Sequence, residues 1–361
     1  MAKTKNRWTI AIMGIVLQLT LGTVYAWSYF QQLVMNAGNW TNTQAAWAFS
    51  LAIFFLGLSA AVGGLVLGRV GPRILAMSGA LLFGVGYFVA AYAIDLRSLP
   101  LLYLGYGVLG GIGLGLGYVT PVATVAKWFP DKKGLVTGMV VMGFGFGALF
   151  MAKVLAPLIM AIVGGSLSSA FYVIGGVMLV MGLPAAYFMV NPPKDFMPGG
   201  YAPRASVGGS AKAVYPISAD KAIMSARFVK MWVIFLCNIT AGIMFIGFQS
   251  PLLQDLLKRT ASAAELQDPA YIAGLAASGA TLIAISSIFN GVGRFFWGGL
   301  SDKLGRITVF RLILGSQLLV FIALLFVDSP LIFGVLVCYI LLCYGGGFGS
   351  MPSDPARRTA R

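Results

Sequence analysis

The stretch SSIFNGVGRFFWGGLSDKLGR, at residues 286–306, decides how this chain folds. Most of it is apolar and belongs to a run long enough to span a bilayer, yet it carries the charged residue Arg294. Ser286, Asn290, Arg294 and Gly298 recur at every fourth residue, so a helix places them on one stripe. A stripe of polar and small residues in a spanning helix faces protein or water. Arg294 is therefore the first candidate for a functional residue.

Similar apolar runs occur along the whole chain. Of 361 residues, 59% are hydrophobic and 10% are charged, whereas soluble domains have about 25% charged residues. Runs of about 20 apolar residues are long enough to cross a bilayer. They lie at 8–35, 44–67, 74–94, 99–126, 134–163, 168–190, 229–254, 271–299, 307–327 and 330–350. The sequence therefore predicts an all-α polytopic membrane protein with these ten helices.

The net charge of +15 indicates membrane topology and not nucleic-acid binding. If the N-terminus is cytoplasmic, the basic residues of the loops fall on the cytoplasmic side, except for Arg97, Lys258 and Arg259. This distribution follows the positive-inside rule. We expect a multi-pass protein of the cell inner (plasma) membrane with a cytoplasmic N-terminus. Its expected partners are the lipid bilayer and no nucleic acid, and we expect a monomer.

Two basic residues, Lys153 and Arg294, fall inside predicted spans. The chain has 10 acidic residues, all at loops, helix ends or the tail, and no histidine. An unpaired cation within a membrane is costly, and an anionic ligand is the partner we expect for it. Because no metal cluster or paired carboxylates lie in the spans, we predict no catalytic residue, metal or cofactor, and no enzyme.

The sequence contains an internal repeat. The turn GLVLGRVGPR at 64–73 is repeated as GGLSDKLGR at 298–306, roughly 230 residues later. GLGYVTP at 115–121 and GFGSMP at 347–352 repeat at a similar offset. Two related halves around a central site are typical of transporters. We predict a six-helix bundle at 1–190, a cytoplasmic linker at 191–227 and a partial bundle at 228–361.

Two helix faces are predicted to line a cavity between these halves. Polar and small residues recur at helical spacing in the first and the seventh predicted spans. The faces are Gln18, Gly22, Tyr25 and Tyr29 in the span at 8–35, and Asn238, Gly242, Phe245 and Gln249 in the span at 229–254.

The repeated turn GGLSDKLGR resembles the signature loop of the major facilitator superfamily. AKWFPDKKGLVTG at 126–138 resembles a loop of its oxalate:formate antiporter branch, and the similarity runs over nearly the whole chain, including GTVYAWSYF at 22–30. The resemblance implies a twelve-helix carrier of small carboxylates that works by alternating access. After Pro352 the chain does not continue as the first half does, so we expect the last two helices to be absent and the second half to contain four.

The resemblance also implies individual roles. The branch's basic residue in its eighth helix matches Arg294, and its aromatic ring matches Tyr25, Tyr118, Phe144, Tyr344 and Phe348. Its second basic residue has no counterpart, and Lys153 is the cation that replaces it. At the turns, where the first copy has Gly68 in place of the family's acid, Asp302 is expected to make the interdomain contact. Arg306, Arg69 and Arg73 are the further gating candidates.

Phe144 and Lys153 cannot both face the predicted cavity if their helix is regular. Nine residues separate them, so a regular helix puts them on opposite faces. Both line the cavity only if the glycines at 134–147 distort this helix, and Phe144 is therefore left out of the candidate site. The predicted substrate-binding residues are Arg294, Lys153, Tyr25, Tyr29, Tyr118, Asn290, Gln249, Tyr344 and Phe348.

Together these observations predict a secondary active transporter of small organic anions. Mono- or dicarboxylates such as oxalate and formate are the expected substrates, and exchange is the expected mode. One alternative is a proton-coupled symporter of lactate- or pyruvate-like monocarboxylates, in which only Lys153 could couple the proton. The other alternative, from a different class, is a non-transporting fragment or sensor.

Overall fold

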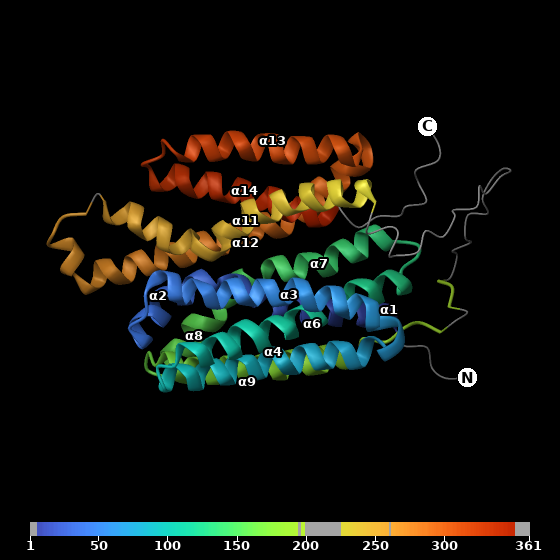
Figure 1. The fold of residues 1–361 in the computed structure, drawn as a ribbon, viewed down its shortest axis with the longest axis horizontal. Coiled ribbons are helices and arrows are strands. Elements are labelled where there is room, and N and C mark those ends of the chain that lie inside the picture. The colour runs from blue at the N-terminus through green and yellow to red at the C-terminus, as the bar shows by residue number, and fades with distance from the viewer. Residues whose placement is uncertain (1–5, 194–195, 199–224, 260, 351–361) are drawn as a thin grey trace.

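The protein is described by a computed structural model that covers residues 6–193, 196–198, 225–259 and 261–350. The side chains of Lys133, Gly134, Arg227 and Asp302 lie outside this description. Every element within the described ranges is a helix, as Figure 1 shows. This confirms the predicted all-α fold class.

The described helices form two groups, which Figure 1 shows as two layers. The first group contains α1 (Arg7–Gly22), η1 (Thr23–Ala26), α2 (Trp27–Gly38), α3 (Asn42–Val70), α4 (Pro72–Asp95), α5 (Leu99–Leu102), η2 (Tyr103–Gly110), α6 (Gly111–Trp128), α7 (Lys133–Phe150), η3 (Met151–Leu155), α8 (Ala156–Ile162) and α9 (Leu167–Tyr187). The second contains α11 (Ala226–Lys258), η4 (Glu265–Gln267), α12 (Pro269–Leu304), α13 (Arg306–Leu324) and α14 (Pro330–Ser350).

The described residues form 10 spans that are long and apolar enough to cross a membrane. Three of them join consecutive elements: α1 with η1 and α2, α5 with η2 and α6, and α7 with η3 and α8. Six spans belong to the first group and four to the second, as predicted. The linker predicted at 191–227 lies mostly outside the described residues, so the domain boundaries stay predictions.

The two repeated turns have the same backbone geometry. Gly71 has φ 86° and ψ 155°, and Gly305 has φ 83° and ψ 151°. Side chains with a Cβ avoid this region, so glycine suits both positions. Each glycine lies directly between two spanning helices, α3 and α4 or α12 and α13. The repeat read from the sequence is therefore also a repeat of local structure.

The two halves meet where α7 packs along α12. A Cβ on Gly145 would lie 2.9 Å from the Cα of Gly291, so the two backbones are as close as glycine allows. The hydroxyl of Ser287 on α12 accepts a hydrogen bond from the Leu149 N–H at 3.1 Å and donates to the Gly145 carbonyl on α7. These are the two groups that a regular α-helix joins directly. The Ser287 side chain thus hydrogen-bonds to two main-chain groups of a helix in the opposite half.

We expect replacement of Ser287 by alanine to weaken the contact between α7 and α12. The two main-chain groups can pair with each other once the hydroxyl is gone, so the loss should be about 1 kcal/mol of unfolding free energy. Reversible denaturation of the purified protein in detergent micelles measures it. Ser278→Ala is the matched control, since that exposed hydroxyl donates to Gly274 of its own helix. Equal effects of the two substitutions would contradict the prediction.

Candidate binding site between the two halves

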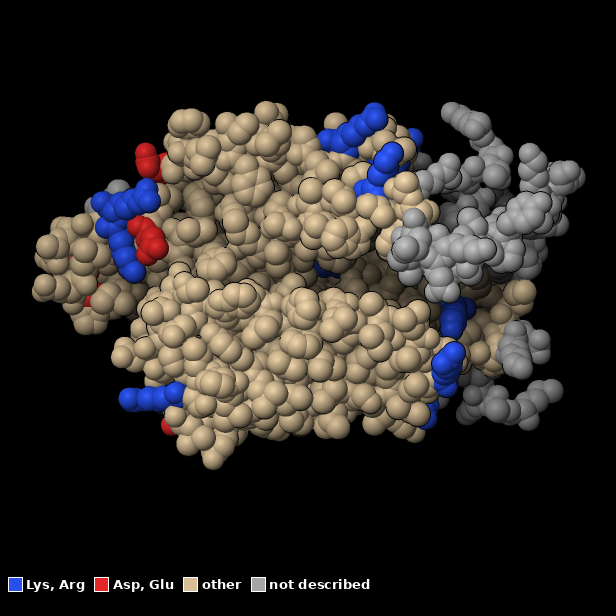
Figure 2. Space-filling view, viewed as in Figure 1, with Lys and Arg blue, Asp and Glu red and all other residues tan. Residues whose placement is uncertain are grey.

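Figure 2 shows a hollow between the two halves, toward the end of the molecule where α1 begins. On the face shown, charged side chains gather at the two ends, and the surface between them is almost entirely uncharged (Figure 2). This is the distribution expected of a protein whose middle lies in a bilayer.

Arg294 on α12 is buried, with 3% of its surface exposed. Its Nε and Nη1 atoms have no hydrogen-bond partner, and no ion pair involving it occurs in the described part of the chain. The guanidinium carbon lies 5.1 Å from the ring centre of Phe348 on α14. A cation–π contact of this kind offsets only part of the cost of burying a charge. The site therefore has unused capacity to bind an anion.

A row of contacting aromatic side chains, called the aromatic chain below, connects Arg294 to the first half. Phe348 packs on Tyr344 with their ring centres 5.2 Å apart, and the Tyr344 hydroxyl lies 2.6 Å from the hydroxyl of Tyr25 on η1. One hydroxyl donates to the other, which leaves one hydroxyl hydrogen free for a ligand. The contact joins the two halves directly beside the buried charge.

Phe144 belongs to the same chain. Its ring packs edge-on against Tyr25 at 5.0 Å and against Tyr118 at 5.1 Å. The structure thus brings together every aromatic residue that the family resemblance matched: Tyr25, Tyr118, Phe144, Tyr344 and Phe348. Phe144, which was left out of the predicted site, therefore lies within this cluster, because this face of α7 packs against η1 and α6.

Several buried side-chain amide oxygens near the aromatic chain lack a hydrogen-bond partner. Asn290, one turn before Arg294, has an unpaired Oδ1. Gln18 donates to the Tyr118 carbonyl at 3.2 Å and Asn238 donates to the Tyr344 carbonyl at 3.4 Å, while the side-chain oxygen of each is unpaired. Gln18 and Asn238 lie on the predicted helix faces but were missed as site residues. Their polarity within apolar spans is the signal that could have identified them as such.

Two predicted residues lie away from Arg294. Gln249 accepts a hydrogen bond from Ser286 at 2.7 Å, and Ser286 precedes Arg294 by about 12 Å along α12 at 1.5 Å per residue. Tyr29 packs edge-on against Phe30 at 5.0 Å and lies outside the contacts that join Tyr25 to Arg294. Gln249 therefore stabilises the contact between α11 and α12 in this conformation.

Lys153 is not brought to Arg294. Its side chain on η3 is exposed, and its ammonium donates to the Thr281 hydroxyl at 2.7 Å. Thr281 precedes Arg294 by about 20 Å along α12 at 1.5 Å per residue. The expectation that the two cations share one cavity does not hold in this conformation, because Lys153 on η3 contacts Thr281, whereas Phe144 on α7 contacts Tyr25.

The gating candidates have separate surroundings. Arg73 donates to the Tyr187 carbonyl at 2.9 Å, and its guanidinium carbon lies 4.4 Å from the Tyr187 ring centre, so it joins α4 to α9 within one half. Arg69 is exposed and Arg306 is half-buried. The Asp302 side chain lies outside the described residues. The proposed interdomain contact at the turns stays a prediction.

Comparisons with known proteins agree with this architecture. The chain is 28% identical to the uncharacterized MFS-type transporter YhjX of Escherichia coli, over 97% of this chain and 80% of that protein. It is 25% identical to the oxalate:formate antiporter of Oxalobacter formigenes, over 96% and 76%. Among solved structures, an inward-facing bacterial homolog of the human lysosomal transporter Spinster superimposes with a TM-score of 0.62 at 15% identity, over 96% and 74%.

The family model described as Major Facilitator Superfamily matches residues 8–356, which is nearly the whole chain. The two groups of helices and the repeated turns are consistent with that match. The chain therefore belongs to the Major Facilitator Superfamily and is a multi-pass membrane protein of transporter type.

Proposed function

We propose that this protein carries small carboxylate anions across the membrane by alternating access and binds them at Arg294. The observation that supports this most directly is the buried guanidinium, with two nitrogens that have no hydrogen-bond partner among the described residues. Arginine keeps its charge under all physiological conditions and matches the shape of a carboxylate. The name of one relative, an oxalate:formate antiporter, is consistent with this chemistry.

The surroundings of Arg294 suit a small and flat anion. Phe348, Tyr344, Tyr25 and Phe144 provide aromatic walls, and the hydroxyl pair of Tyr25 and Tyr344 has one free hydrogen to donate. A carboxylate bound to Arg294 within reach of that hydrogen would be held by charge-assisted hydrogen bonds. Tyr25 and Tyr344 come from different halves, so a ligand at this place contacts both.

The charge in the site favours one negative charge on the substrate. Arg294 is the basic residue of the aromatic chain, while Lys153 contacts Thr281 elsewhere on α12. One carboxylate neutralises one guanidinium, whereas a fully ionised dicarboxylate would leave a negative charge in a site of low polarity. We therefore expect a monocarboxylate, such as formate, to bind at least as readily as oxalate.

Exchange is the transport mode that we propose. An empty site would carry the Arg294 charge unpaired while the halves close over it, and this raises the free energy of the occluded state. A bound anion removes that penalty, so the halves move when the site is filled. Proton symport is the second candidate, but Lys153, its coupling group in the sequence-based hypothesis, lies away from Arg294 in this conformation.

We further propose that the protein is a monomer in the inner (plasma) membrane, with the N-terminus in the cytoplasm. The distribution of basic residues at the loops supports this orientation.

A first experiment measures thermal stabilisation of the purified protein by formate, acetate, lactate, pyruvate, oxalate and malonate. A ligand that binds the folded state stabilises it by about 2.7 kcal/mol at a concentration of one hundred times its Kd. We expect selective stabilisation by one or a few of these acids, and we expect Arg294→Gln to abolish it. Arg69→Gln is the matched control, because it removes an exposed charge and should leave the response unchanged. Full stabilisation of the Arg294→Gln variant would refute the assignment.

A second experiment distinguishes the transport modes in proteoliposomes. Labelled uptake of the stabilising acid is measured into vesicles that contain the same acid, into empty vesicles, and into empty vesicles with an inward proton gradient. Exchange predicts rapid uptake only into the loaded vesicles. Uptake into empty vesicles that follows the proton gradient would instead establish symport. Binding without uptake under any of these conditions would support the fragment or sensor alternative.

A further inference from the structure

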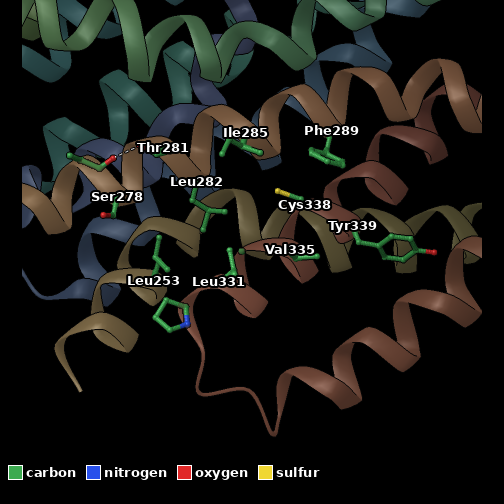
Figure 3. Close-up of a pocket in the computed structure, with 13 residues that line it drawn as sticks. Leu253, Ser278, Thr281, Leu282, Ile285, Phe289, Leu331, Val335, Cys338 and Tyr339 are labelled. Atoms are coloured by element: carbon green, nitrogen blue, oxygen red, sulfur yellow. Dashed lines mark hydrogen bonds between the residues drawn. The ribbon is translucent and has the colours of Figure 1, made fainter. Parts of the chain in front are cut away.

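A second concave surface lies on the outside of the second half, between α11, α12 and α14 (Figure 3). This groove has a volume of about 650 Å³. Its walls are mainly apolar and consist of residues such as Leu253, Leu282, Ile285, Phe289, Leu331 and Val335. Leu331 and Val335 are 77% and 60% exposed, so the groove opens outward and not into the hollow between the halves.

One end of the groove is polar. Ser278 and Thr281 line it there, and Figure 3 shows both on the same stretch of α12. Thr281 donates its hydroxyl hydrogen to the Ala277 carbonyl and accepts a hydrogen bond from the ammonium of Lys153. The ammonium therefore lies at the edge of the groove, bonded to one of its lining residues.

Lys153 has no anionic partner in the described part of the chain. It belongs to the span Leu135–Ile162, about 13 Å from the end of that span at 1.5 Å per residue. An exposed lysine at this depth faces the bilayer, where an unpaired charge is costly. Its long side chain can reach toward the headgroup region, where lipid phosphate groups lie.

We propose that this groove binds one anionic phospholipid. An acyl chain lies along the apolar walls formed by α12 and α14, and the phosphate group pairs with the ammonium of Lys153. Charge complementarity selects this occupant, because the groove combines a long apolar surface with a single cation at one end. The lipid would lie beside the contact between η3 and α12, where the two halves meet.

This site is separate from the proposed substrate site. The contact of Lys153 with Thr281 precedes Arg294 by about 20 Å along α12. The lipid proposal therefore does not depend on the identity of the transported anion, and loss of one site leaves the other intact.

The first test compares phosphatidylglycerol with phosphatidylcholine of the same acyl chains. The full chain is purified in detergent, titrated with each lipid, and the bound fraction is measured by native mass spectrometry. We expect an affinity for phosphatidylglycerol about fivefold higher, the preference that one lysine near an anionic headgroup gives. Lys153→Gln should abolish this preference and Lys153→Arg should keep it. Lys230→Gln, which removes an exposed lysine on α11, is the matched control and should keep it.

The second test fills the groove. A Cβ on Gly334 would lie 3.6 Å from Leu282 Cδ1, an ordinary contact, so Gly334→Leu places its larger side chain in the groove without a backbone clash. We expect this variant to bind less of both lipids. Gly57→Leu is the matched control. Gly57 is exposed on α3, and a Cβ at this position would meet no atom within 4 Å.

Three results would overturn the proposal. They are equal affinity of the unmodified protein for the two lipids, an undiminished preference for phosphatidylglycerol in Lys153→Gln, and undiminished lipid binding in Gly334→Leu. Each variant is first checked for a single folded species by gel filtration and thermal unfolding. If Lys153→Gln does not fold, the lipid preference of Lys153→Arg and the lipid binding of Gly334→Leu still decide the outcome.

Discussion

The burial of the Arg294 charge, with no acidic partner among the described residues, is the constraint on which the candidate site depends. A guanidinium that is 3% exposed retains its charge, so its surroundings must supply compensation. Phe348 supplies part of it through its ring, and the polar groups of the aromatic chain supply dipoles. Since Tyr344 and Tyr25 bring in the first half by a direct hydrogen bond, the compensation is shared between halves that must separate during transport. In the proposed function, an anion bound at this arrangement would therefore contact groups from both halves.

Much of the fold follows from information that is local in sequence. Hydropathy over about 20 residues is enough to place a spanning helix, and all the described spans agree with it. The repeated turns were recognisable from their similar sequences. The matching geometry of Gly71 and Gly305 gives the reason, because both have a backbone conformation that suits glycine. The polar stripe around Arg294 was likewise predictable, because a charge and an amide one turn apart contrast with an apolar background. Family resemblance, and not periodicity, identified Phe144 and Tyr118.

The rest depends on which face of a helix meets which neighbour, and a nearly uniform apolar helix does not reveal this. Phe144 on α7 and Lys153 on η3 belong to one span, and its sequence alone gives neither face priority. The packing of α7 on α1 and on α12 decides between them, through the close approach of Gly145 to Gly291 and the hydrogen bonds of Ser287. Ser287 was not predictable as a contact residue, because a serine in a spanning helix usually bonds within its own helix. The irregular turn at Met151–Leu155 follows immediately, next to the place where Ser287 interrupts regular packing.

The two intramembrane cations differ in their surroundings, and the roles that we propose for them differ accordingly. Arg294 is buried beside the contact between Tyr25 and Tyr344, where we propose that the transported anion binds. A planar guanidinium suits that task, because it binds a carboxylate in a defined orientation and its charge does not vary. Lys153 is exposed beside an apolar groove, where the available anions are lipid headgroups. A flexible ammonium suits this second task, because its long side chain can follow a headgroup whose depth varies. The same cost of an unpaired charge thus supports both proposals, a transported anion at Arg294 and a bound lipid at Lys153.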